Sequence, residues 1–381
     1  MKKNTFIISV LILTTVLLSI LALSNKEKRL VRKDVPKIPE EITKETFGTF
    51  LLVGFRGTEL ATSSPEYRMF SEVKPGGVLL YNRDFEDPKK PRNITGRDQL
   101  KELIAQARAI AGEDLTVAAD VEGGYVNRLK PEYGFLRIPS HAELGTSTPK
   151  NTKEIALQIA QELADVGIDL NLAPVVDVNV NPASPAIGAL ERSFSADPKI
   201  VSLHAGAFIE AHQELGIGTS LKHFPGHGSA GYDTHLGVVD VTKTYKAEEL
   251  EPYKTLIEGG YADAVMTAHV INKDVSPLPA TLSKEFLTDI LRDELEFKGV
   301  VITDDLLMGA IMEQYGLADA AVRAFEAGSD WLIISNNIDT YDLQSIYTVR
   351  DALYDAYTSG RISEERVKQS LERIQEFKSR Y

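Results

Sequence analysis

Residues 151–178, NTKEIALQIAQELADVGIDLNLAPVVDV, contain the unit from which the fold can be predicted. Residues 151–167 have the apolar spacing of an amphipathic helix, whereas residues 170–178 form a short apolar run rich in Val and Leu. A continuous apolar run is typical of a strand in a parallel sheet, because helices cover both faces of such a sheet.

This alternation repeats along the chain from about residue 46. The apolar runs are TFLLVGF (49–55), GGVLLY (76–81), LTVAAD (115–120), LNLAPVVDV (170–178), GTSLKHF (218–224), DAVMTAH (263–269), GVVITDD (299–305) and DWLIIS (330–335). Eight such runs between helical patterns predict a single-domain (β/α)8 TIM-type barrel. The alternative is a doubly wound open sheet, but no glycine-rich dinucleotide fingerprint follows the first run.

The N-terminus carries a basic tip and then an uncharged apolar run from Phe6 to Leu23. Such a run is near the lower limit for crossing a bilayer and exceeds a typical signal-peptide core. We therefore expect residues 1–24 to be a signal peptide or a retained signal anchor, residues 25–45 a linker, and residues 46–381 an exported barrel in the cell envelope. Intact-mass analysis that finds a mature protein beginning near Asn25 would show that the segment is cleaved and would contradict membrane association.

Composition excludes several classes of function. The first 34 residues carry seven Lys or Arg against two Asp or Glu, so the rest of the chain has a net charge of −18 within a total of −13. An acidic body argues against nucleic-acid binding, which requires positive surface. The chain has no cysteine, which excludes disulfides, thiolate zinc sites and a cysteine nucleophile.

Polar residues end several of the predicted strands. They are Asp120, Asp177, Lys222, His223, His269, Asp304 and Asp305. In a (β/α)8 barrel the carboxyl ends of all strands meet at one rim, where active sites lie. A site for a polar ligand explains this convergence better than a set of separate structural ion pairs.

The segment KHFPGHGSAGYDTH (222–235) holds three of the seven histidines. Three interpretations compete: a metal site, an acid/base apparatus and a solvated loop. His223 and His227 would share a helix face at this spacing, but Pro225 and Gly226 prevent a helix, which argues against zinc.

The acid/base interpretation rests on Asp233 and His235. Their side chains can meet in an extended or turned segment, and the carboxylate would then fix the tautomer of the imidazole. We expect the glycines at 226, 228 and 231 to let this loop move over a bound ligand.

Two further motifs supply carboxylates. In ITDDLLMGA (302–310), Asp304 can act as a nucleophile, and Asp305 points to the opposite side as its structural partner. In AADVEGGYVNRL (118–129), a turn at Gly123–Gly124 can return Arg128 to Asp120. The two side chains can then both bind a sugar, or they can simply form an ion pair with each other. A carboxylate and a proton donor together are the machinery of glycoside hydrolysis.

These motifs resemble those of glycoside hydrolase family 3, in particular its bacterial β-N-acetylglucosaminidases, which release terminal N-acetylglucosamine. The similarity runs from about residue 46 to residue 381. Besides residues 222–235 it includes GFRGTEL (54–60), GGVLLYNRDF (76–85), DVEGGYVNRL (120–129), LAPVVDVNVNP (172–182), ERSF (191–194), MTAH (266–269) and GVVITDDLLMGA (299–310).

The resemblance implies a role for each matching position. Asp304 matches the nucleophile, His235 the histidine acid/base and Asp233 its partner. The positions that hold the sugar match Asp120, Arg128, Arg192, Lys222 and His223, and no metal or cofactor is implied. Tyr125 stands where the motif usually has Arg, and Val121 where it usually has Gln, which puts the aglycone preference in question.

The expected protein is a monomeric, retaining exo-β-N-acetylglucosaminidase, and peptidoglycan fragments or other envelope glycans are its expected substrates. The alternatives are a family 3 β-glucosidase or β-xylosidase, a phosphorylase, a metal-dependent hydrolase and an inactive glycan-binding protein. A panel of nitrophenyl glycosides, a chelator and a turnover assay distinguish them.

Overall fold

The computed structural model describes residues 38–39, 41–234 and 237–381. The predicted export segment and His235 therefore lie outside the described residues. Within the described part of the chain, no helix is both long and apolar enough to cross a membrane.

Eight parallel strands follow one another around a nearly closed barrel. They are β1 (Leu51–Gly54), β2 (Gly77–Leu79), β3 (Thr116–Ala119), β6 (Leu170–Asn171), β7 (Gly218–Phe224), β9 (Ala264–Thr267), β12 (Val300–Ile302) and β13 (Leu332–Ile334). From β1 to β12 each strand pairs with the next, and β13 pairs with β1. A bridge between Ile302 and Trp331 joins β12 to the start of β13. The predicted (β/α)8 barrel is confirmed, each apolar run contains one strand, and the open-sheet alternative is wrong.

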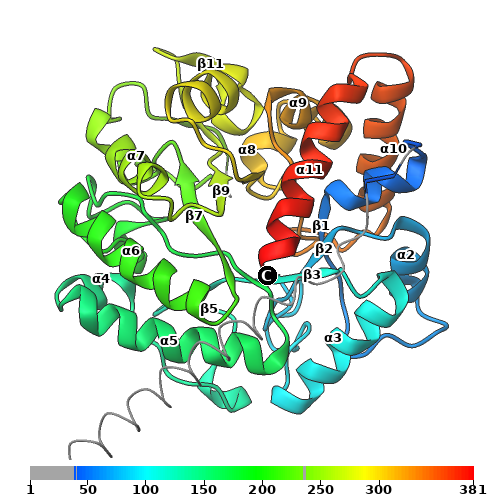
Figure 1. Cartoon of the computed structure of the whole chain (residues 1–381), viewed down its shortest axis with the longest axis horizontal. Helices are drawn as coiled ribbons and strands as arrows, with labels where there is room; N and C mark the ends of the chain where they lie inside the picture. Colours follow the sequence, from blue (N-terminus) through cyan, green and yellow to red (C-terminus); the bar gives the residue numbers. More distant parts are fainter. Residues whose placement is uncertain (1–37, 40, 235–236) are drawn as a thin grey trace, which may run out of the picture.

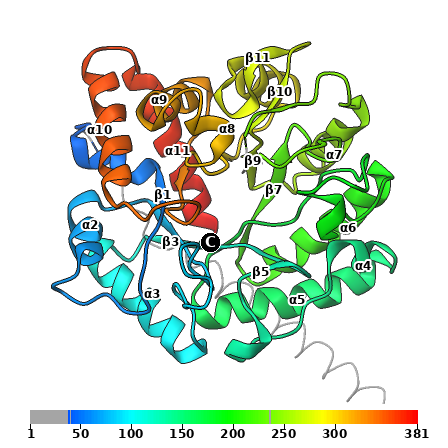
Figure 2. The ribbon, with the colours of Figure 1, turned by 180° about the vertical axis from the view of Figure 1, so that it is seen from behind.

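Helices surround the strands on all sides (Figure 1, Figure 2). The longer ones are α2 (Pro65–Val73), α3 (Arg97–Ala111), α5 (Pro149–Val166), α6 (Pro198–Glu214), α7 (Glu251–Glu258), the π-helix η6 (Glu285–Glu294), α9 (Leu317–Ala327), α10 (Gln344–Thr358) and α11 (Glu364–Arg380). Just before η6, the side chain of Ser283 accepts a hydrogen bond from Phe286 N at 3.2 Å.

Short elements decorate the barrel. They are η1 (Lys44–Phe50), the hairpin β4 (Val121–Gly123) and β5 (Val126–Asn127), η2 (Pro131–Tyr133), α4 (His141–Gly145), η3 (Gly188–Leu190), η4 (Ala247–Leu250), η5 (Ala280–Leu282), α8 (Gly309–Met312), and a small sheet of β8 (Val239–Asp240), β10 (Val270–Asn272) and β11 (Ser276–Pro279). The hairpin follows β3 directly, so it carries residues 121–127 over the carboxyl end of the barrel.

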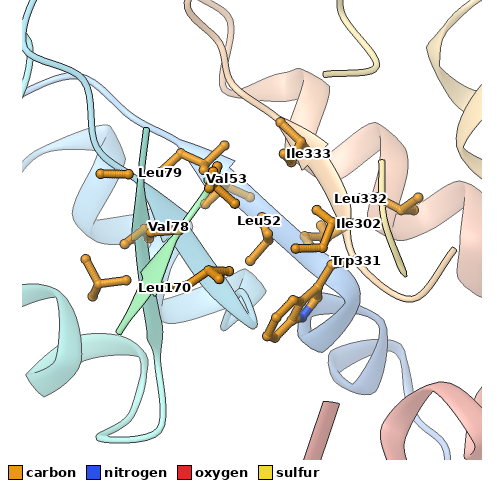
Figure 3. Close-up of a cluster of buried hydrophobic side chains, with 14 of the residues drawn as sticks. Leu52, Val53, Val78, Leu79, Leu170, Ile302, Trp331, Leu332 and Ile333 are labelled. Carbon is orange, nitrogen blue, oxygen red and sulfur yellow. The ribbon is translucent and has the colours of Figure 1, made fainter. Parts of the chain in front are cut away.

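Apolar side chains from the strands pack against one another within the barrel (Figure 3). Leu52, Val78 and Ile302 are at most 1% exposed, as expected for strands covered on both faces. Trp331 is fully buried, and its indole N–H donates to Thr49 O at 3.1 Å. The barrel is therefore a packed core, and its chemistry must lie at the rim.

Asp330 anchors the opposite, amino-terminal end of the barrel. Its side chain is completely buried just before β13 and accepts hydrogen bonds from Arg292 Nη2 at 2.7 Å and from Val301 N at 3.0 Å. Arg373 Nη1 lies 3.1 Å from the other carboxylate oxygen. One carboxylate thus connects η6, β12 and α11.

Replacing Asp330 with Ala would leave buried guanidinium groups without their counter-charge. We expect the free energy of unfolding to fall by about 3–5 kcal/mol, measured by urea denaturation. The matched control is Asp319→Ala, because the Asp319–Arg323 pair is about 40% exposed on both sides. That change should cost no more than about 0.5 kcal/mol, and equal losses in the two variants would contradict the anchoring role.

Candidate active site

A cavity of about 1330 Å³ opens at the carboxyl ends of the strands. Seven of the eight predicted site residues line it: Asp120, Arg128, Arg192, Lys222, His223, Asp233 and Asp304. The eighth, His235, lies outside the described residues, so the predicted contact between Asp233 and His235 stays a prediction. Residues from four separate βα units are brought together here.

The β4–β5 hairpin returns Arg128 to Asp120, as the glycine pair predicts. Gly123 has a φ of +100°, and a Cβ there would lie 2.1 Å from Pro139 O, so only glycine fits this turn. Arg128 N donates to Asp120 O at 3.0 Å, and Arg128 Nη2 lies 3.0 Å from Asp120 Oδ2. The two side chains therefore pair with each other and also line the cavity, and their binding of a sugar stays a prediction.

Lys222 lies between two carboxylates. Its Nζ is 2.8 Å from Asp120 Oδ1 and 2.7 Å from Glu122 Oε1, and its side chain is only 1% exposed. Burial alone would raise the pKa of Asp120, but the charges of Lys222 and Arg128 outweigh it and lower the pKa to about 2. Asp120 is consequently ionised at neutral pH and can only accept hydrogen bonds.

Arg192 extends this chain of charges. Its Nε and Nη2 each donate to a different oxygen of Glu122 at 2.8 Å, a bidentate pair that holds the pKa of Glu122 well below its usual range despite burial. Arg192 Nη2 also lies 3.3 Å from His223 Nε2. Because a guanidinium has no acceptor, this network assigns the proton of His223 to Nδ1, which donates to Asp177 Oδ2 at 2.8 Å.

Asp177 and His269 lie beneath the rim rather than on it. We expected both at the ligand-facing rim, but each is fully buried and neither lines the cavity. Asp177 accepts from His227 N at 2.7 Å as well as from His223, and these contacts lower its pKa although burial opposes this. His269 Nε2 lies 2.9 Å from Asp305 O. Both side chains therefore orient the residues that do face the cavity.

The two aspartates after β12 have different surroundings. Asp304 is partly buried and lines the cavity, and its Oδ1 accepts from Asp305 N at 2.8 Å. Asp305 Oδ1 accepts from Leu307 N at 3.1 Å and from Ser335 N at 3.2 Å, while Ser335 Oγ bonds to Oδ2. Burial, together with the charge of Asp304, raises the pKa of Asp305 to about 6. This agrees with a structural role for Asp305.

Two of the three loop glycines are needed for close packing, and movement of the loop over a ligand stays a prediction. A Cβ at Gly228 would lie 1.7 Å from Val178 O, and one at Gly226 would lie 2.7 Å from Glu249 Cβ. Of these three glycines, only Gly231 would have open space around an added Cβ. The start of the loop is also fixed, because Ser229 N donates to buried Glu249 Oε2 at 3.1 Å.

Sequence reasoning missed Glu122 and Asn171. Asn171 Oδ1 accepts from Val121 N at 3.0 Å and its Nδ2 donates to Val121 O at 3.1 Å, which fixes the backbone between Asp120 and Glu122. The sequence did contain a signal for Glu122, because the predicted sugar site had three cationic side chains but only one carboxylate. Such buried cations require another anionic partner.

A metal site finds no support in the described part of the chain. No three His, Asp or Glu side chains are grouped there to hold an ion. The rings of His223 and His227 do approach, at 6.0 Å between centroids, but through a turn and not on a helix face.

Comparison with known proteins identifies what this chain resembles. A model of the glycosyl hydrolase family 3 N-terminal domain matches residues 42–377. A Beta-hexosaminidase from Idiomarina loihiensis is 35% identical over 295 residues, which cover 75% of this chain and 84% of that protein. A Beta-hexosaminidase from Nitrosomonas eutropha is 31% identical over 331 residues, which cover 84% of this chain and 90% of that protein.

Comparison with solved structures finds the same family. A glycoside hydrolase family 3 β-N-acetylglucosaminidase from a Paenibacillus species has a TM-score of 0.80 and 35% identity over 89% of this chain. The match spans 63% of the Paenibacillus chain, so that protein is longer than the shared region. A β-N-acetylhexosaminidase from Beutenbergia cavernae has a TM-score of 0.79 and 28% identity, and the match covers 99% of it.

The low pKa of Asp120 makes stability depend on pH. A carboxyl whose folded pKa is about 2, against an ordinary 3.8, stabilises the fold above pH 4 and loses this contribution as pH falls toward 2. Asp120→Asn should therefore lower the free energy of unfolding by about 2 kcal/mol at pH 7, with the difference vanishing near pH 2. Urea denaturation at several pH values measures this.

Asp240 provides the matched control. Its pKa is also lowered to about 2, by hydrogen bonds from Lys273 and Thr242, but its side chain is 39% exposed. Salt should therefore abolish the smaller effect of Asp240→Asn at about 0.5 M while leaving that of Asp120→Asn in place. Equal salt sensitivity would contradict a shielded network at Asp120.

Proposed function

Since this chain belongs to glycosyl hydrolase family 3 and is a glycoside hydrolase of the β-N-acetylhexosaminidase type, we propose that it is a retaining exo-β-N-acetylglucosaminidase. The observation that carries the proposal is the position of Asp304. It lines the same cavity as the network of Asp120, Arg128 and Lys222. A sugar held by that network can present its anomeric carbon to the Asp304 carboxylate.

Recognition of the sugar falls to the charged network. The ionised Asp120 carboxylate accepts hydrogen bonds from two vicinal hydroxyls, and Arg128 and Lys222 donate to sugar oxygens. These cations keep one orientation because each is already held by a carboxylate. His223 contributes its Nε2 edge, and its tautomer is set by Asp177 and Arg192. The site is therefore organised before the sugar binds.

The chemical steps use one nucleophile and one acid/base. Asp304 attacks the anomeric carbon while His235, oriented by Asp233, donates a proton to the departing glycosidic oxygen. The neutral imidazole then removes a proton from water, which attacks the glycosyl–Asp304 ester and releases the sugar with its original β configuration. Asp305 keeps the nucleophile in place through its hydrogen bonds to Ser335 and Leu307.

The natural substrates in this proposal are peptidoglycan fragments or other envelope glycans. The support is the apolar N-terminal run, which is expected to export the protein or anchor it in the membrane. Release of N-acetylglucosamine from the disaccharide of N-acetylglucosamine and N-acetylmuramic acid tests this. Turnover of chitin-derived disaccharides alone would reject peptidoglycan as the substrate.

The activity itself is tested with residues 35–381 and nitrophenyl β-glycosides of N-acetylglucosamine, glucose and xylose. We expect hydrolysis of the first substrate to dominate and to survive a strong chelator. A preference for glucose or xylose would assign another specificity, and products carrying phosphate in phosphate buffer would indicate a phosphorylase.

Asp304→Ala should lower kcat by at least about 10³-fold, because the covalent step loses its nucleophile, with the fold unchanged by circular dichroism. A slow fluorosugar substrate should label the wild-type peptide that contains VITDD (301–305). Asp305→Asn is the matched control, since it keeps the side-chain shape beside the nucleophile. Label on Asp305 instead of Asp304 would reverse the two roles.

Replacing Asp233 or His235 with Ala should affect substrates according to their leaving group. Alkyl or sugar aglycones need protonation and should slow by about 10²–10⁴-fold, whereas dinitrophenyl glycosides should lose much less. Because each residue acts through the other, the double variant should lose little beyond the worse single variant. Equal slowing of both substrate classes, or rescue by zinc, would refute the acid/base pair.

A further inference from the structure

The cavity that Asp304 lines is also lined by residues outside the proposed sugar site. We call the part lined by Arg83, Phe85, Met308, Met312, Asn337 and Tyr341 its outer part. They follow strands β2, β12 and β13, whereas Lys222 lies on β7 and Arg192 follows β6. In the order of the barrel, β12, β13, β1 and β2 lie across from β6 and β7. Asp304 follows β12, so in the proposed reaction the anomeric end of a sugar held by Lys222 and Arg192 faces the side of the barrel that carries the outer part.

Phe85 is the unusual residue of this outer part. Its side chain lines the cavity and is nevertheless 57% exposed. Removing the apolar surface of a Phe side chain from water is favourable, so an exposed ring favours the binding of a ligand that covers it. Such a ring in the lining of the cavity offers an apolar face to a ligand.

The loop around Phe85 is held rigidly on both sides. Phe85 N donates to Asn337 Oδ1 at 2.9 Å, which joins the β2 loop to the β13 loop. The preceding Asp84 is 5% exposed and accepts from both Arg56 Nε and Arg92 Nη1 at 2.8 Å. The ring is therefore presented on a fixed backbone, which reduces the entropy lost when a ligand binds.

Glu86, the next residue, also bonds this loop to other segments. Glu86 Oε1 accepts from Tyr341 N at 3.2 Å, and Arg56 contacts the other oxygen of this carboxylate. The guanidinium of Arg56 also lies over the Tyr341 ring at 4.4 Å. Three successive residues, 84 to 86, are thus bonded to other segments, while the Phe85 side chain alone projects into open space.

Apolar groups from another loop line the same outer part. Met308 and Met312 come from the segment after β12, and Met312 is 39% exposed. Asp339 and Thr340 add exposed polar groups. A pyranose ring combines an apolar C–H face with hydroxyl edges, so it matches an exposed aromatic ring beside polar side chains.

We propose that the outer part of the cavity is a subsite for the second sugar ring of the substrate, with Phe85 as its stacking platform. The inference rests on the proposed function, because it needs Asp304 at the anomeric carbon. The leaving sugar then lies over the Phe85 ring, and Phe85 determines how well disaccharides are used relative to substrates with small leaving groups.

The test compares N,N′-diacetylchitobiose, which has a second ring, with β-N-acetylglucosaminyl azide, which does not reach Phe85. In Phe85→Ala, kcat/KM for chitobiose should fall about tenfold, while that for the azide should change by less than about twofold. Phe85→Trp should restore chitobiose turnover. The matched control is Leu203→Ala, since Leu203 is 61% exposed on α6 and does not line the cavity. Both substrates should be unaffected there.

The outcomes separate the two proposals. Equal loss on both substrates, or unchanged chitobiose turnover, in Phe85→Ala overturns the subsite while the azide reaction still supports the glycosidase. If the wild-type protein hydrolyses neither substrate, the proposed function fails and the subsite fails with it.

Discussion

The buried ammonium group of Lys222 is the constraint on which the site depends. A lysine that is 1% exposed is stable only if carboxylates compensate the loss of water, and Asp120 and Glu122 do so at 2.8 and 2.7 Å. These partners come from one turn after β3, so the β4–β5 hairpin must close tightly, and the glycine at 123 is required for that. Arg128 and Arg192 then balance the remaining carboxylate oxygens.

A second tier of buried groups supports this network from below. Asp177 fixes the ring of His223 and the backbone of His227, and Asn171 fixes the backbone beside Asp120. His269 contacts the backbone carbonyl of Asp305. None of these three polar side chains is more than marginally exposed, so the low local dielectric strengthens their hydrogen bonds. The side chains above them therefore have little freedom to reorient when a ligand arrives.

The cavity combines two kinds of surface. Its inner part is charged and internally neutralised, which suits hydroxyl groups that need directed hydrogen bonds. Its outer part exposes apolar side chains such as Phe85 and Met312 on a braced loop and a short helix. Asp304 lines the same cavity.

The sequence by itself determined the barrel and most of the rim, because buried parallel strands leave continuous apolar runs and because polar residues at their ends stand out against such runs. It also indicated the return of Arg128 to Asp120, since the glycine pair is local. It could not distinguish Asp177 and His269, which are buried and orient other residues, from Asp304, which faces the cavity. The reason is that burial beneath the rim depends on neighbouring strands. Glu122, the packing role of Gly228 and the exposed Phe85 likewise depend on contacts between segments far apart in the chain, and only the tertiary structure decides those contacts.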